Sequence, residues 1–222
     1  MQLLKQALIF FEDLIFPPCC LICGKISKKY LCKNCKNMLK KKAIFKIETT
    51  KKEEYNFEKY CYIFEYKNEI RNLILNYKFH DKSYLYKVFS EIILKNKKIY
   101  GFLKKYDIII PIPIHKKRKK QRGYDQSELI AKEIVKNIEN IKYENNIIEK
   151  TKNTLPQSSL NKNQRQKNVQ GVYRVTNEEK IKNKKIILFD DIFTTGNTVN
   201  ECAKILKEKG AKEVLVLTLA KD

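Results

Sequence analysis

From about residue 57 to the end of the chain, short apolar runs alternate with amphipathic stretches. The apolar runs have the length and the β-branched or aromatic content of strands, and the amphipathic stretches repeat their apolar positions at helical spacing. Strands are predicted at residues 60–66, 107–114, 184–190 and 213–219, and helices at residues 69–79, 84–94, 125–141 and 197–209. This alternation predicts an α/β fold, a parallel sheet flanked by helices on both faces.

Two of the predicted helices carry end signals. Asp125 stands at the N-cap position of its helix, and Glu128 follows three residues later, which is the capping-box pattern. Gly210 ends the helix at 197–209. Residues 151–170 are polar and almost free of apolar periodicity, and a loop of that length inside a compact domain is usually functional or mobile.

The N-terminal part of the chain follows a different pattern. The apolar positions of residues 1–15 recur at helical spacing, which predicts an amphipathic helix packed on the next module. The alternative is a helix that lies on a membrane surface. Residues 17–39 hold most of the cysteines, and the charged stretch 40–56 is interpreted as a linker. We therefore divide the chain into an N-terminal module with its linker, residues 1–50, and a second domain, residues 51–222.

Composition and charge leave the predicted fold unchanged, and they indicate which positions and partners to consider. The 222 residues include 47 Lys and Arg against 25 acids, a formal net charge of +22, which favours nucleic acid or phosphate-rich ligands as partners. Only five of these cations are Arg, and the other 42 are Lys, so much of the charge is expected on solvated faces. Arg and Gly are scarce in this chain. Where one of them occurs, the position is a candidate for a role that requires guanidinium geometry or a positive φ.

The sequence also indicates a compartment. No run approaches the ~18 apolar residues that a membrane span requires. The N-terminal stretch has no small-residue cleavage site, and Glu12 and Asp13 interrupt its apolar face, so a secretory signal is not expected. The prediction is a cytoplasmic protein with reduced thiols and no transmembrane segment.

Four of the seven cysteines form two CxxC pairs, Cys20 with Cys23 and Cys32 with Cys35. Each pair lets two thiolates reach one ion from a tight turn, and two pairs complete a tetrahedral four-sulfur site. Because no position remains open for water, a structural Zn²⁺ is predicted. The alternatives are disulfides or a redox CxxC pair, which a reducing compartment disfavours. Cys19 is an alternative first ligand, and Cys20 is favoured over it.

Residues 186–198 carry the strongest functional signal. An apolar strand delivers two adjacent acids, Asp190 and Asp191, to its carboxyl end, and a hydroxyl-rich loop then leads into a helix. The loop and the start of the helix contain Thr194, Thr195, Gly196, Asn197 and Thr198. Backbone N–H groups and hydroxyls at a helix N-terminus surround a phosphate, while carboxylates accept hydrogen bonds from sugar hydroxyls or engage a ligand's metal ion. A dinucleotide fingerprint and a Walker loop do not fit, and the alternative is a capped strand–loop–helix turn.

This segment resembles the ribose-phosphate signature of type I phosphoribosyltransferases, which bind phosphoribosyl pyrophosphate (PRPP). With the cysteine module, nearly the whole chain resembles the ComF (ComFC-like) competence protein family. Further matching residues are Pro111, Ile112, Pro113 and Arg118, the run from Arg122 to Gln126, Lys78 and Asp81, and Gln157, Leu160, Arg165, Asn168 and Val169. The family usually has Asn where Asp125 stands and Phe where Tyr173 stands.

The resemblance implies a type I phosphoribosyltransferase fold preceded by a small zinc module. It implies that Asp190 and Asp191 are the catalytic-site carboxylates that hold the ribose hydroxyls and Mg²⁺. The loop at 194–198 takes the 5′-phosphate, and the turn at Ile112 and Pro113 corresponds to the pyrophosphate loop.

A basic run at residues 115–123 follows that turn and includes two of the five arginines, Arg118 and Arg122. Such a cluster would neutralise a pyrophosphate leaving group, and the alternative is a solvated basic loop. The long polar loop described above resembles the family's mobile loop, which closes over the site and excludes water, with Gln157 and Arg165 on it.

Two functions follow from the resemblance. The first is a ComF protein that binds PRPP with Mg²⁺ and also single-stranded DNA, and that assists DNA uptake or processing in natural transformation together with DNA-uptake proteins. The alternative is an active phosphoribosyltransferase that acts on a purine or related amine and releases pyrophosphate. The residues identify neither a general base nor a nucleobase-binding hood, so PRPP binding is a stronger prediction than catalysis. Intact Asp190, Asp191 and Gly196 argue against a third function, a zinc-bearing nucleic-acid adaptor with a degenerate ligand site.

Overall fold

The computed structural model describes residues 17–51, 54–152, 154 and 168–222. The amphipathic helix expected at residues 1–15 lies outside this part of the chain. The chain divides into two compact units, Met1–Ala43 and Ile44–Asp222. Among the described residues, no helix is long and apolar enough to cross a membrane.

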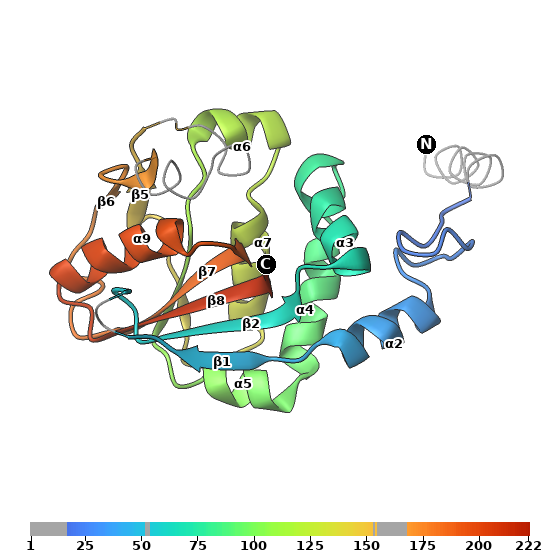
Figure 1. The fold of residues 1–222 in the computed structure, drawn as a ribbon, viewed down its shortest axis with the longest axis horizontal. Helices are drawn as coiled ribbons and strands as arrows, with labels where there is room; N and C mark the ends of the chain where they lie inside the picture. Colours follow the sequence, from blue (N-terminus) through green and yellow to red (C-terminus); the bar gives the residue numbers. More distant parts are fainter. Residues whose placement is uncertain (1–16, 52–53, 153, 155–167) are drawn as a thin grey trace, which may run out of the picture. The chain divides into compact units, whose positions relative to one another are not determined.

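The described part of the first unit is a cysteine-bearing loop followed by helix α2 (Lys33–Lys42) (Figure 1). The loop turns tightly where the N–H of Gly24, at φ 70°, donates to the carbonyl of Cys20 at 2.9 Å. Besides two of the cysteines, only Leu31 and Leu39 are buried in this described part. The unit therefore has very little apolar core of its own.

The second unit is built on a six-stranded sheet with the order β1-β2-β8-β7-β3-β4. Its strands are β1 (Lys46–Thr49), β2 (Lys59–Glu65), β3 (Ile108–Pro111), β4 (Lys142–Tyr143), β7 (Lys185–Phe193) and β8 (Glu213–Lys221). The edge strand β1 is antiparallel to β2, and every other neighbouring pair is parallel. β5 (Ile148–Lys150) and β6 (Tyr173–Val175) form a separate antiparallel pair. The predicted α/β fold with a mostly parallel sheet is confirmed.

Helices cover both faces of this sheet (Figure 1). They are α3 (Asn68–Phe79), α4 (Leu85–Lys95), α5 (Lys97–Leu103), α6 (Lys116–Arg122), α7 (Gln126–Lys136) and α9 (Asn197–Glu208). Because side chains alternate along a strand, Ile186 and Leu188 of β7 share one core cluster with Val199 of α9. Ile187 and Phe189 point to the other face, where α7 packs, and they are fully buried as well. Burial on both faces explains why this strand is an unbroken apolar run.

Residues 40–56, interpreted above as a linker, instead contribute β1 to the sheet. Glu48 of β1 accepts hydrogen bonds from the hydroxyls of Tyr60 and Tyr62 on β2, and it pairs with Lys221 of β8 at 3.3 Å. These contacts hold a polar segment at the sheet edge. They join residues far apart in the chain, so the local sequence pattern does not indicate them.

Other boundaries also differ from the predictions. The helix expected at 125–141 ends at Lys136, the strand expected at 107–114 ends at Pro111, and β7 continues through the acid pair to Phe193. The basic run 115–123 forms α6 for most of its length, where the alternative interpretation was a loop. A helix at this place matters because it fixes which of the basic side chains share a face.

The predicted N-cap of α7 is confirmed. The Asp125 carboxylate accepts a hydrogen bond from the N–H of Glu128 at 3.1 Å. The reciprocal half of the capping box does not form, because the Glu128 carboxylate pairs with Lys119 and Lys132, each at 2.6 Å.

Candidate functional site

A pocket of about 990 Å³ opens where the chain leaves β3 and β7. Its other walls come from α3, α6, the β5–β6 pair and the start of α9. It brings together every described residue that the sequence assigned to the phosphate site: Ile112, Pro113, Arg118, Arg122, Asp190, Asp191, Thr194, Thr195, Gly196, Asn197 and Thr198. Gln157 and Arg165 lie outside the described residues.

The two adjacent acids of the pocket have different environments. Asp190 accepts a hydrogen bond from the N–H of Asp191 at 2.8 Å, and burial, followed by the charge of Asp191, raises the pKa of Asp190 to about 8. Asp191 pairs with Lys78, Nζ to Oδ1 2.8 Å, and both side chains are largely shielded from solvent. Near neutral pH the pocket therefore favours a proton on Asp190 and an ammonium beside Asp191. A cation or a hydroxyl donor bound beside Asp190 would favour its ionised form and lower its pKa again.

The loop between β7 and α9 requires glycine at position 196. Gly196 has φ 72°, and a Cβ there would lie 2.8 Å from the ring of Phe193 and 3.0 Å from the ring of Tyr55. Gly196 is also the N-cap of α9, and no side chain caps this helix. The first N–H groups of α9 are thus placed beside the hydroxyls of Thr194 and Thr198, an arrangement that suits an anion.

Four cations form what we call the basic wall of the pocket: Arg71, Arg118, Arg122 and Lys150. Within the described part of the chain, none of the four makes an ion pair with a carboxylate. Arg122 donates from Nη1 to Oε1 of Gln126 at 3.0 Å, and its guanidinium lies 4.9 Å from the centre of the Phe79 ring. Burial lowers the pKa of Arg122, an effect that a bound anion would oppose.

Helix α6 sorts the basic run by face. Arg118 and Arg122 are four residues apart, so they share one side of the helix, and both line the pocket. Lys116 and Lys119 pair with carboxylates on other elements. No residue of α6 is buried. The helix therefore presents its arginines to the pocket and its lysines elsewhere.

The sequence patterns did not identify Arg71, Phe79, Lys150 or Tyr173 as pocket residues. Lys78 was noted only for its family resemblance, and it pairs with Asp191. The amphipathic pattern predicted α3, but nothing in that pattern indicates that its last turns reach the pocket. The strands β5 and β6 have three residues each, too few to show a period.

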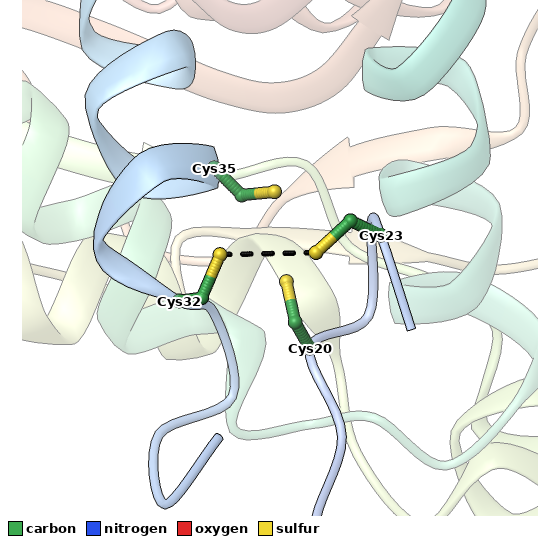
Figure 2. A group of neighbouring side chains, drawn as sticks. All are labelled: Cys20, Cys23, Cys32 and Cys35. Atoms are coloured by element: carbon green, nitrogen blue, oxygen red, sulfur yellow. Dashed lines mark hydrogen bonds between the residues drawn. The ribbon is translucent and has the colours of Figure 1, made fainter. Parts of the chain in front are cut away.

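The four cysteines of the CxxC pairs converge in the first unit, as Figure 2 shows. The group consists of Cys20, Cys23, Cys32 and Cys35, whose sulfur atoms all lie within 4.8 Å of one another. The sulfurs of Cys23 and Cys32 are 3.8 Å apart. Zinc–sulfur bonds of about 2.3 Å in a tetrahedron imply sulfur separations of about 3.8 Å. Cys19 is exposed, and its thiol donates to the carbonyl of Pro17 at 3.2 Å, so Cys20 is the member of the group.

The thiols of this group differ in their tendency to ionise. Burial opposes ionisation of Cys20, but hydrogen bonds from backbone N–H groups outweigh it and lower its pKa to about 6. Burial and the neighbouring sulfurs raise the pKa of Cys35. A cation held by all four sulfurs would remove this conflict, because metal binding favours the thiolate at each ligand.

Comparison with known proteins finds a domain match in the second unit and relatives that cover much of the chain. Residues 125–222 match the family model of the phosphoribosyl transferase domain. The chain is 27% identical over 210 residues to competence protein F of Haemophilus influenzae, which covers 92% of this chain and 85% of that protein. It is 30% identical over 159 residues to competence protein ComFC of Streptococcus pneumoniae, covering 72% of this chain and 66% of that protein.

Two other matches cover a smaller share of the chain. The DNA utilization protein YhgH of Escherichia coli O6:H1 is 29% identical over 115 residues, 52% of this chain and 49% of that protein, so the chain spans about half the length of this relative. A solved hypoxanthine phosphoribosyltransferase from Staphylococcus aureus overlaps with a TM-score of 0.38 and 15% identity, covering 62% of this chain and 65% of that one.

Proposed function

The chain belongs to the ComF competence protein family and carries a phosphoribosyltransferase domain. From this premise we propose that it binds PRPP with Mg²⁺ in the pocket at β3 and β7, and that it binds single-stranded DNA in natural transformation. One observation carries the PRPP proposal: the acid pair, the Gly196 loop and the basic wall all line the same pocket.

The three parts of the pocket match the three parts of PRPP. A 5′-phosphate suits the N-terminus of α9 and the hydroxyls of the loop before it. The vicinal ribose hydroxyls donate well to Asp190 and Asp191. The pyrophosphate group requires several cations, which the basic wall supplies. A volume of about 990 Å³ lies within the range of small-molecule sites.

The donor set of the acid pair also fits Mg²⁺, which prefers carboxylate oxygen and substrate phosphate ligands. Asp190 and Asp191 would hold this ion, and when bound it would neutralise charge on the pyrophosphate. Lys78 holds the Asp191 carboxylate at the edge of the pocket, which positions one of these oxygens.

We assign the four-cysteine group as a structural Zn²⁺ site. The support is the number and type of the ligands and the sulfur separations, and the group contains no further donor among the residues that the structure describes. A closed four-sulfur set leaves no coordination position for substrate, so its contribution is to the folding of the first unit.

The DNA proposal rests on charge and on the relatives. Two similar proteins are named for competence and a third for DNA utilization. The formal net charge is +22, and α6 carries the exposed lysines Lys117 and Lys120, which make no ion pair within the described residues. Single strands follow such cationic surfaces through their phosphates.

Calorimetric titration tests the PRPP proposal. The wild-type chain should bind PRPP in the presence of Mg²⁺, and the double variant Asp190→Asn with Asp191→Asn should bind at least tenfold more weakly, because its amides are poor partners for the metal ion. Glu208→Gln, an exposed acid of α9 outside the pocket, serves as the control and should bind normally. No binding by the wild type would reject the proposal, and full affinity in the double variant would reject the role of the acids. Pyrophosphate release with purines in the same preparation would extend the proposal to transfer chemistry.

Binding to single-stranded DNA should weaken steeply as salt rises, because phosphate contacts release counterions. The charge reversal Lys117→Glu with Lys120→Glu should weaken binding further and reduce the salt slope by about 1.4, because each lost phosphate contact on a single strand accounts for about 0.7. Fluorescence anisotropy with a labelled oligonucleotide measures both. The matched control is Lys204→Glu on α9. An affinity that does not change with salt would contradict charge-driven binding.

A further inference from the structure

Lys150, the last residue of β5, is the lysine of the basic wall. Its side chain lines the pocket and is largely covered by protein. It makes no ion pair with any described carboxylate, and its ammonium lies 5.6 Å from the centre of the Tyr173 ring. A covered lysine without a carboxylate partner is unusual, because isolated buried charges are costly.

The β5–β6 register explains this placement. Lys150 is directly opposite Tyr173, and Glu149 is directly opposite Arg174. Since neighbouring residues on a strand face opposite sides, the two cross-strand pairs lie on different faces. Glu149 and Arg174 neutralise each other through an ion pair of 2.8 Å on the exposed face. The pocket face keeps the lysine and a buried aromatic ring, and the charge of Asp190 in the same pocket only partly offsets the effects that lower the pKa of Lys150.

The charges near Lys150 point to an anionic ligand. Burial lowers its pKa, and the positive charge of Arg118 lowers it further. Tyr173 is only 7% exposed, so its ring holds the ammonium at the pocket wall and stabilises it by a cation–π contact. An anion between Lys150 and Arg118 would remove the repulsion and partner two cations at once.

We infer that Lys150 binds the pyrophosphate group of PRPP and that it is the residue by which the pocket distinguishes PRPP from ribose 5-phosphate. The inference rests on the proposed function, and it adds a ligand contact from β5 that the phosphate motif does not contain. Lys150 shares the wall with Arg118, which follows the turn assigned to pyrophosphate, whereas the 5′-phosphate is assigned to the loop before α9. We therefore expect a ligand without the pyrophosphate to leave the anion position between Lys150 and Arg118 unfilled.

The test compares three ligands, PRPP with Mg²⁺, inorganic pyrophosphate and ribose 5-phosphate, on the full-length chain. In Lys150→Met, which keeps the length and apolar stem of the side chain, affinity for PRPP and pyrophosphate should fall at least tenfold. Affinity for ribose 5-phosphate should stay within twofold. Lys150→Arg should restore most of the loss, since a guanidinium also pairs with phosphate. Lys142→Met, an exposed lysine of β4 outside the pocket, is the control and should match the wild type.

The outcomes separate the two proposals. If the wild type binds PRPP and Lys150→Met binds it equally well, the inference about Lys150 is wrong and the proposed function stands. If Lys150→Met loses PRPP and ribose 5-phosphate to the same extent, the residue supports the structure and does not select the ligand. If the wild type binds no PRPP, the proposed function fails and the inference fails with it.

Discussion

Replacing Cys32 and Cys35 by serine should abolish zinc binding and unfold the first unit, while the second unit stays folded. Elemental analysis should find about one zinc per chain in the wild type and none in the double variant. The energetic reason is the small core: Leu31 and Leu39 are the only buried apolar side chains besides two cysteines in the described part of this unit. Modules of this size usually need a metal or disulfides to fold, and structural zinc supplies about 10–16 kcal/mol of apparent binding free energy.

Cys19→Ser is the matched control for this experiment. Cys19 is next to a ligand in sequence, but it is exposed and its sulfur is not in the four-sulfur group. This variant should keep its zinc. Hydrogen exchange should show lost protection in residues 17–43 of the double variant and unchanged protection in β7 and β8. A full zinc complement in the double variant, or zinc loss in Cys19→Ser, would contradict the assignment of the ligands.

The sheet was predictable wherever burial on both faces leaves a continuous apolar run. β7 and β8 have nine residues each, nearly all of them buried in β8, and such runs are visible without any tertiary information. β1 shows the opposite case. It is a polar strand at the sheet edge, held by contacts of Glu48 with Tyr60, Tyr62 and Lys221, and these contacts exist only once the sheet has formed.

Some parts of the candidate site were also predictable from the sequence, and others were not. Its acid pair and its Gly196 loop are contiguous in the chain, so one strand–loop–helix motif indicates them together. Arg71, Phe79 and Lys150 reach the pocket from α3 and β5. Their positions depend on how these elements pack on the sheet, and a sequence motif carries no information about that packing. The arginines of α6 were partly predictable. Their four-residue spacing indicates a shared face, but only once the segment is known to be helical.

Asp125→Asn should stabilise the protein by about 2–3 kcal/mol at pH 8 and by only about 0.5 kcal/mol at pH 4. The Asp125 side chain is 7% exposed, and burial raises its pKa to about 6 against the opposing effect of the N–H groups of Glu128 and Ile114. The folded state therefore holds a proton that the unfolded state releases near pH 4. This contribution to stability is fully present below pH 4 and is lost as pH rises through about 6. The size of the gain follows from the gap between the folded and unfolded pKa values, because a tenfold change in proton affinity corresponds to about 1.4 kcal/mol.

Asparagine is the informative substitution because it separates the charge from the cap. Its side-chain oxygen still accepts from the N–H of Glu128, the bond that measures 3.1 Å in the wild type. Asp125→Ala removes the charge and the cap together, so it should be less stable than Asp125→Asn by about 1 kcal/mol at every pH. Urea unfolding of the three proteins between pH 4 and pH 8 measures both effects. If Asp125→Asn were less stable than the wild type at pH 8, the hydrogen bonds of the carboxylate would outweigh the cost of burying its charge.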